Sequence, residues 1–240
     1  MIGAGARAGG TVGSPIGIAL AVRLWLNLGM CNRFRMTAAQ AELAQRYGVA
    51  MPFAPDQEAP PPELFPDRSA FVVRHDDSGA RVLDTMRWGF PHQVPGKRID
   101  KATGRPVLLE KRITNVRNYT SPFWRSALRQ PSRRCLVPFT AFSEYAQTRG
   151  EDGKLPLHWF DVPSQPITSF AGVWRPTDTG PVFAFLTTEP NPLVAPIHPK
   201  AMPVLLHQGD EERWLTADEP DALALAVPFP SQLMRLDFTS

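Results

Sequence analysis

Short runs of apolar residues, each bounded by turn-forming residues, follow one another along most of the chain. Their alternation at period two and their content of β-branched and aromatic residues predict strands. The predicted strands cover 69–74, 81–88, 134–137, 140–145, 156–161, 168–174, 181–188 and 202–206. Many short strands in one domain favour an α+β fold, a mixed, strongly curled antiparallel sheet or barrel with peripheral helices.

Three segments have the pattern of peripheral helices. A capping box at 37–40 predicts the start of the first, and Gly48 predicts its end. Shorter helices are expected around 209–214 and over 221–226. Residues 52–66 are rich in proline and predict a stiff loop, too rigid for a helix and too irregular for a strand.

Residues 1–29 differ in composition from the rest of the chain. They are rich in Gly, Ala, Leu and Ile, and they lack both the cleavage site of a signal peptide and a continuous membrane-spanning run. We therefore expect 1–29 to be a misassigned or removed leader. The domain is expected over 30–240, with Met30 as the true start and without a membrane segment.

The charge balance gives no overall sign of nucleic-acid binding. The net charge is +3, and because Arg7 and Arg23 lie in the leader, 24 basic residues face 23 acidic ones from residue 30 onward. Any nucleic-acid function therefore has to depend on a local cluster. One basic cluster lies between 111 and 134 and contains Lys111, Arg112, Arg117, Arg125, Arg129, Arg133 and Arg134.

The chain has two cysteines, Cys31 and Cys135. Two thiols cannot build a disulfide framework, and no His/Cys cluster has the spacing of metal ligands. We expect a reducing compartment and neither a metal nor a cofactor.

Cys31 follows Met30, and removal of an initiator methionine would make Cys31 the first residue. An N-terminal cysteine carries an amine and a thiol on adjacent carbons. Its amine, with an ordinary pKa of about 8, can condense with an aldehyde to a Schiff base. The thiol can then close a thiazolidine ring. The alternative interpretation of a lone Met-Cys pair is a small buried hydrophobic residue.

Three further segments contain candidate catalytic residues. Asn115 lies in a polar, basic stretch, and such a stretch by itself is more often a solvated loop than a site. Glu144 lies between Phe142 and Tyr145, where desolvation would raise its pKa and suit it to proton transfer, unless it points to water from a strand edge. His198 lies in a proline-bounded loop and could act as a general acid or base, or be merely exposed.

Five motifs occur in order along the chain, and together they resemble the SRAP family, the SOS-response-associated proteins that process abasic sites. The motifs are Met30-Cys31-Asn32-Arg33, Trp88-Gly89-Phe90-Pro91, Asn115-Val116-Arg117, Arg134-Cys135-Leu136-Val137-Pro138 with Glu144, and Ile197-His198-Pro199-Lys200-Ala201-Met202-Pro203. The resemblance covers residues 30 to about 216. Each motif alone is weak, and their shared order makes the resemblance specific.

The resemblance implies a covalent thiazolidine crosslink between Cys31 and the aldehyde of an abasic site. Asn115 would orient the opened sugar or the amine, Glu144 would move protons, and His198 would help to open the sugar ring. The implied partner is single-stranded DNA with abasic sites in the DNA damage response. We expect a cytoplasmic, nucleoid-associated protein, and a monomer, since nothing in the sequence suggests an obligate interface.

The resemblance also implies DNA contacts by five residues. Arg33, Arg117 and Lys200 would bind phosphates, and Trp88 would wedge against or stack on a base. Thr187, at the end of the predicted strand 181–188, is a weaker candidate for a phosphate or lesion contact.

Some positions depart from the family pattern, and they affect groove contacts more than the Cys–Asn–Glu–His set. Asn32 stands where many members have glycine, and Pro199-Lys200 stands where Asp-Arg is common. Two other functions remain open. One is a thiol autopeptidase that cleaves before Cys31, and the other is a non-covalent single-stranded DNA-binding protein.

Overall fold

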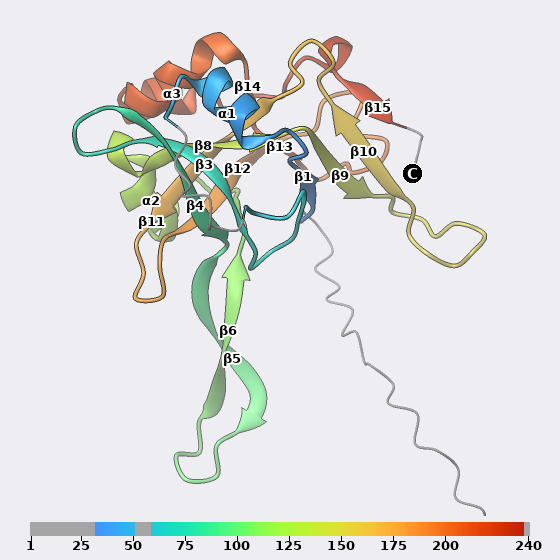
Figure 1. Cartoon of the computed structure of the whole chain (residues 1–240). Coiled ribbons are helices and arrows are strands. Elements are labelled where there is room, and N and C mark those ends of the chain that lie inside the picture. The colour runs from blue at the N-terminus through green and yellow to red at the C-terminus, as the bar shows by residue number, and fades with distance from the viewer. Residues whose placement is uncertain (1–31, 51–58, 238–240) are drawn as a thin grey trace, which may run out of the picture.

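The computed structural model describes residues 32–50 and 59–237. Figure 1 shows a body of curved strands with helices at its periphery and one long hairpin that projects from it. The predicted nucleophile Cys31 lies outside the described residues. So do residues 51–58, which include the first part of the predicted proline-rich loop.

Five strands of the largest sheet pair in a closed ring. Their pairing order is β12–β4–β3–β8–β11 and back to β12, and every pair is antiparallel except β4 with β12. This ring confirms the expected curled sheet or barrel. The strands are β3 (Ser69–His75), β4 (Arg81–Trp88), β8 (Arg134–Phe139), β11 (Thr168–Arg175) and β12 (Val182–Thr188).

Three two-residue strands extend the same sheet. β13 pairs with β12, β14 pairs with β11, and β7 runs parallel to β12. The predicted strand 202–206 is therefore two strands that belong to different neighbours. The three are β7 (Asn115–Val116), β13 (Met202–Pro203) and β14 (Leu205–Leu206).

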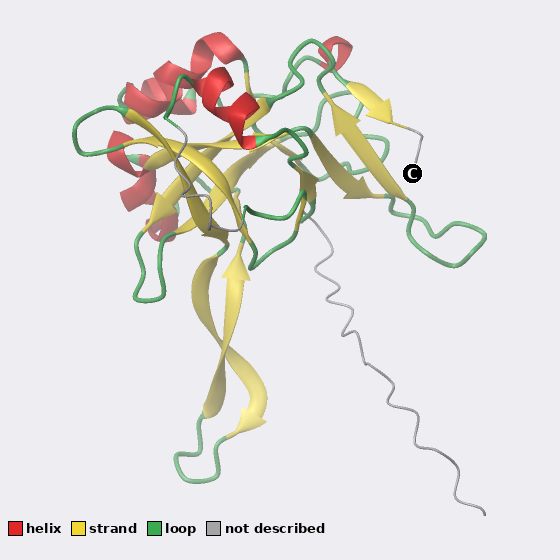
Figure 2. Cartoon of the chain, in the orientation of Figure 1, coloured by secondary structure: helices red, strands yellow, loops and turns green. Residues whose placement is uncertain are grey.

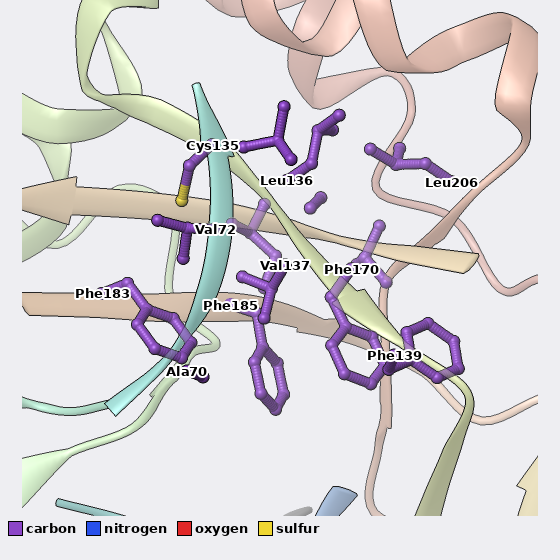
Figure 3. Close-up of a cluster of buried hydrophobic side chains, with 14 of the residues drawn as sticks. Ala70, Val72, Cys135, Leu136, Val137, Phe139, Phe170, Phe183, Phe185 and Leu206 are labelled. Atoms are coloured by element: carbon purple, nitrogen blue, oxygen red, sulfur yellow. The ribbon is translucent and has the colours of Figure 1, made fainter. Parts of the chain in front are cut away.

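The interior of the ring is filled by aromatic side chains from several strands (Figure 3). Phe139 and Phe170 stack with ring centroids 3.9 Å apart, and Phe170 stacks on Phe185 at 4.6 Å. Gly172 of β11 is needed here, because a Cβ at this position would lie 2.8 Å from the Cys135 sulfur. Close packing of this kind tolerates little added volume.

A second sheet lies beside the ring, in the order β15–β10–β9–β1–β2 with antiparallel pairs. The short strand β2 falls within 52–66, so the expectation that this whole segment is a loop was wrong at its end. The backbone there pairs with β1. The strands are β1 (Phe34–Arg35), β2 (Glu63–Leu64), β9 (Ala141–Tyr145), β10 (Leu157–Asp161) and β15 (Arg235–Asp237).

The helices are short and lie at the periphery of the body (Figure 2). The first helix was predicted, but its N-cap is Ala39, whose N–H donates to Glu42 Oε2 at 2.6 Å. Gly48 ends it with φ +64°, as expected. No helix of the described ranges is long and apolar enough to cross a membrane. The helices are α1 (Gln40–Tyr47), α2 (Pro122–Leu128), α3 (Glu211–Thr216) and α4 (Glu219–Leu223).

The projecting hairpin consists of β5 (Phe90–Ile99) and β6 (Pro106–Ile113). Neither strand was predicted, because prolines interrupt β5 and polar residues break the alternation. Proline is tolerated in a two-stranded ribbon, where each strand has a free edge. We call this hairpin the arm.

Candidate functional site

Glu144 is buried on β9, with 4% of its surface exposed. The sequence left open whether this carboxylate points to water, and the structure answers that it does not. A buried carboxylate must be held by polar neighbours. His198 lies beside it, with Nδ1 3.9 Å from Glu144 Oε2, a separation longer than a hydrogen bond.

His198 is held by its own loop. Its N–H donates to the Val194 carbonyl at 2.8 Å, and Nδ1 lies 2.8 Å from the Ala201 carbonyl oxygen. A carbonyl only accepts, so Nδ1 carries a proton in this contact. In the neutral imidazole, Nε2 is then the acceptor nitrogen. The histidine is thus buried rather than exposed, and in its neutral form Nε2 is the ring nitrogen that can accept a proton.

Asn115 lies on β7, beside β12 and opposite Phe185. Its side chain is buried, and Nδ2 donates to Thr114 Oγ1 at 2.9 Å. Thr187 is also buried, and its hydroxyl donates to the Val116 carbonyl at 3.3 Å. The parallel pairing of β7 with β12 therefore fixes Asn115 and Thr187 on neighbouring backbones.

The start of the described chain runs alongside Glu144. β1 pairs Phe34 with Phe142, and Ser143 N–H donates to the Arg33 carbonyl at 3.1 Å. Continuing this antiparallel register places Asn32 opposite Glu144. Residue 31 is the next position along the chain, and one residue of extended chain spans only about 3.4 Å.

His158 is a neighbour of Glu144 that the sequence analysis missed. It lies on β10 directly opposite Glu144, and directly opposite residues of an antiparallel pair share one face of the sheet. Its side chain is half-buried. The sequence could have indicated this neighbour, because the predicted strands 140–145 and 156–161 are consecutive and could pair as a hairpin.

The expectation that Trp88 stacks on a base was wrong. Trp88 is fully buried, with its ring stacked on Phe183 and Phe185 at centroid distances of 6.3 and 5.2 Å. Its Nε1 donates to the Thr114 carbonyl at 3.0 Å. Trp88 thus braces the backbone next to Asn115 instead of reaching DNA.

The three predicted phosphate contacts have different surroundings. Arg33 makes an ion pair with Glu63, and its guanidinium lies over the Phe65 and Trp159 rings, at 5.1 and 5.4 Å from their centroids. Arg117 and Lys200 are exposed. Contact of any of them with a phosphate stays a prediction.

The basic cluster between 111 and 134 does not form one surface. Arg134 is buried and donates to the carbonyls of Leu128, Trp214 and Ala217 at 2.6–3.1 Å. Its role is to join α2, α3 and β8. Arg129 makes an ion pair with Glu219 at 3.2 Å, whereas Arg112 makes ion pairs with Asp67 and Glu110.

The second cysteine is unsuited to nucleophilic chemistry. Cys135 is fully buried in the ring of strands, and burial raises the pKa of its thiol far above the ordinary value. Across the described residues, no group of three or more His, Cys, Asp or Glu side chains could hold a metal ion.

Comparison with known proteins decides the family. The family model of the SOS response associated peptidase (SRAP) matches residues 30–238. The chain belongs to the SRAP family. The match contains all five motifs and begins at Met30, although 29 residues precede it in the sequence.

Curated relatives of this SRAP chain carry a functional name. The abasic site processing protein YoaM of Bacillus subtilis (strain 168) is 26% identical over 85% of this chain and 88% of its own length. The abasic site processing protein YoqW of the same organism is 27% identical over 85% of this chain and 90% of its own length.

Solved structures share the fold. A crystal structure of a Bordetella bronchiseptica protein matches with a TM-score of 0.65 at 21% identity and covers 86% of this SRAP chain and 98% of its own. A Bacteroides thetaiotaomicron protein matches with a TM-score of 0.64 at 22% identity, over 86% of this chain and 90% of its own. These likenesses support the α+β fold with curled sheets.

Proposed function

We propose that this SRAP chain processes abasic sites in single-stranded DNA by forming a covalent thiazolidine crosslink through Cys31. The names of the two Bacillus relatives support the general activity. The observation that carries the proposed crosslink is the buried pair of Glu144 and His198. This pair lies beside β1, and the chain before β1 leads back to Cys31. A carboxyl group and an imidazole in such a place suit proton transfer.

The chemistry requires Cys31 to be the first residue of the mature chain. The ring-opened abasic sugar carries an aldehyde at C1′. The Cys31 amine adds to this carbon, and loss of water leaves a C=N bond. The thiolate then attacks the same carbon, the π electron pair moves to nitrogen, and nitrogen takes the proton that the thiol gave up. One water is released, and nothing is oxidised or reduced.

The neighbouring side chains would move the protons in these steps. Glu144 in its acid form would protonate the departing hydroxyl, and its carboxylate would take the proton of the thiol. His198 Nε2 would accept the proton of the sugar hydroxyl as the ring opens. Asn115 would orient the opened sugar, and the exposed Arg117 and Lys200 would contact the flanking phosphates.

The proposal is tested by denaturing electrophoresis. A chain starting at Met30 is incubated with a single-stranded oligonucleotide that holds one abasic site, and with a matched oligonucleotide that holds a tetrahydrofuran analogue. We expect a shifted, denaturation-stable band only with the first, because the analogue has no aldehyde. The absence of that band would contradict the covalent proposal and favour non-covalent binding.

Glu144→Gln is expected to slow adduct formation by about 100-fold or more, because an amide of the same shape cannot take up and release the proton. The initial rate of band formation measures the effect. Glu151→Gln, a change at an exposed carboxylate in the β9–β10 loop, is the matched control and should leave the rate unchanged. A rate within twofold of normal for Glu144→Gln would remove this residue from the mechanism.

A further inference from the structure

The positive charge of this protein is concentrated on the arm. Residues 90–113 hold six cations and two carboxylates, a net charge of +4, whereas the whole chain has +3. The rest of the chain therefore sums to −1. The cations of the arm are Lys97, Arg98, Lys101, Arg105, Lys111 and Arg112.

Four of these cations surround the tip, and all four are exposed: Lys97, Arg98, Lys101 and Arg105. Within 32–50 and 59–237, no carboxylate lies at ion-pair distance from them. The nearby Asp100 is engaged by the turn, since its Oδ1 accepts the N–H groups of Ala102 and Thr103 at 2.9 Å. These bonds lower the pKa of Asp100 and shape the tip. The tip thus carries four cations and one carboxylate, a net charge of +3.

The arm also exposes large apolar side chains. Ile99, Leu108 and Leu109 are 53%, 59% and 50% exposed. The hairpin has no core of its own to bury them, and it projects away from the body (Figure 1). Unpaired cations beside apolar side chains suit DNA, whose backbone offers phosphates and whose major groove offers the methyl groups of thymine for apolar contact.

The root of the arm is fixed, and it adjoins the candidate site. Arg175 donates to the Pro91 carbonyl at 3.2 Å and lies over the Phe90 ring at 4.6 Å. His92 packs on Phe123 with ring centroids 5.3 Å apart. β6 ends two residues before Asn115. With strands of eight to ten residues, the tip lies roughly 30 Å from the site, about nine base pairs of duplex.

We propose that the arm is a duplex-binding ribbon, which lies along double-stranded DNA flanking the lesion with its tip cations on phosphates. A two-stranded ribbon fits the major groove, which is about 12 Å wide. The position of the lesion rests on the proposed function, whereas binding of the arm to duplex DNA does not.

Fluorescence anisotropy with undamaged DNA tests the arm. The probes are a labelled 12-nucleotide single strand and the same strand extended by a 15-base-pair duplex. The variant carries Lys97→Ser, Arg98→Ser, Lys101→Ser and Arg105→Ser. We expect this variant to bind the extended probe at least 10-fold more weakly. The slope of the logarithm of the binding constant against the logarithm of the salt concentration should fall in magnitude by up to about 3.6, since each phosphate contact contributes about 0.9. Its affinity for the single strand should change much less.

A charge-preserving variant is the matched control. Lys97→Arg, Arg98→Lys, Lys101→Arg and Arg105→Lys keep the charge of the tip and should keep the affinity for the extended probe. Unchanged affinity and salt slope in the serine variant would overturn the proposal. Equal weakening on both probes would overturn the assignment to duplex DNA.

A second readout separates this proposal from the proposed function. On an abasic oligonucleotide of five nucleotides, too short to reach the tip, the serine variant should form the adduct at the normal rate. If neither the normal protein nor the variants form the adduct, while the serine variant still binds duplex DNA more weakly, only the proposed crosslink is contradicted.

Discussion

Cys31→Ala is expected to abolish the denaturation-stable adduct. Alanine keeps the α-amine and can form a Schiff base, but it has no thiol to close the ring, and a simple imine hydrolyses in water. Borohydride should therefore trap a band with Cys31→Ala that is absent without the reductant. Electrophoresis with and without borohydride measures both outcomes.

Cys135→Ala is the matched control for this loss. Its thiol is buried and its pKa is raised, so the adduct should form at the normal rate. The cavity left by the sulfur would lower the free energy of unfolding by about 1–2 kcal/mol. An adduct that is stable without reduction in Cys31→Ala would assign the reaction to another nucleophile.

A chain that keeps all residues from Met1 should form no adduct, whereas a chain started at Met30 should form it fully. When residue 30 remains attached, the nitrogen of Cys31 is an amide, whose lone pair is delocalised and cannot condense with an aldehyde. Adduct yield, measured beside the intact mass of each preparation, checks the expectation. The chain started at Met30 is the matched control, because removal of its initiator methionine alone exposes the amine of Cys31.

The intact mass also distinguishes the autopeptidase hypothesis. If the longer chain is recovered with a mass that begins at Cys31, and Glu144→Gln or Cys31→Ala stops this processing, self-cleavage supplies the free amine. A longer chain that keeps its full mass and still forms the adduct would contradict the requirement for a free amine.

The strands of the barrel were predictable because each buries a short apolar run. Runs such as 69–74 and 168–174 appear as β3 and β11 with nearly the same bounds. The arm was not predictable in this way, because its strands are solvated and carry prolines. Their register depends on cross-strand pairing that periodicity does not reveal.

The sequence predicts a set of candidate site residues, but it does not predict the surroundings of each one. Periodicity could not decide the burial of Glu144, because consecutive residues from Phe142 to Glu144 are all buried. The same limit produced the error at Trp88: an exposed tryptophan and a core tryptophan look alike in sequence. Arg134 was mistaken for surface charge because two of its three carbonyl partners, Trp214 and Ala217, lie 80 and 83 residues further along the chain.

The central claim is that amine and thiol of Cys31 both bond to the abasic sugar, and peptide mass spectrometry tests it directly. Trypsin should release the peptide Cys31-Asn32-Arg33 from the mature chain. After nuclease digestion of the crosslink, we expect this peptide to carry the sugar remnant with loss of one water. Iodoacetamide should not alkylate it, because its sulfur is in the ring. A remnant on a lysine such as Lys200, or a Cys31 peptide that carries the sugar and still alkylates, would contradict the account.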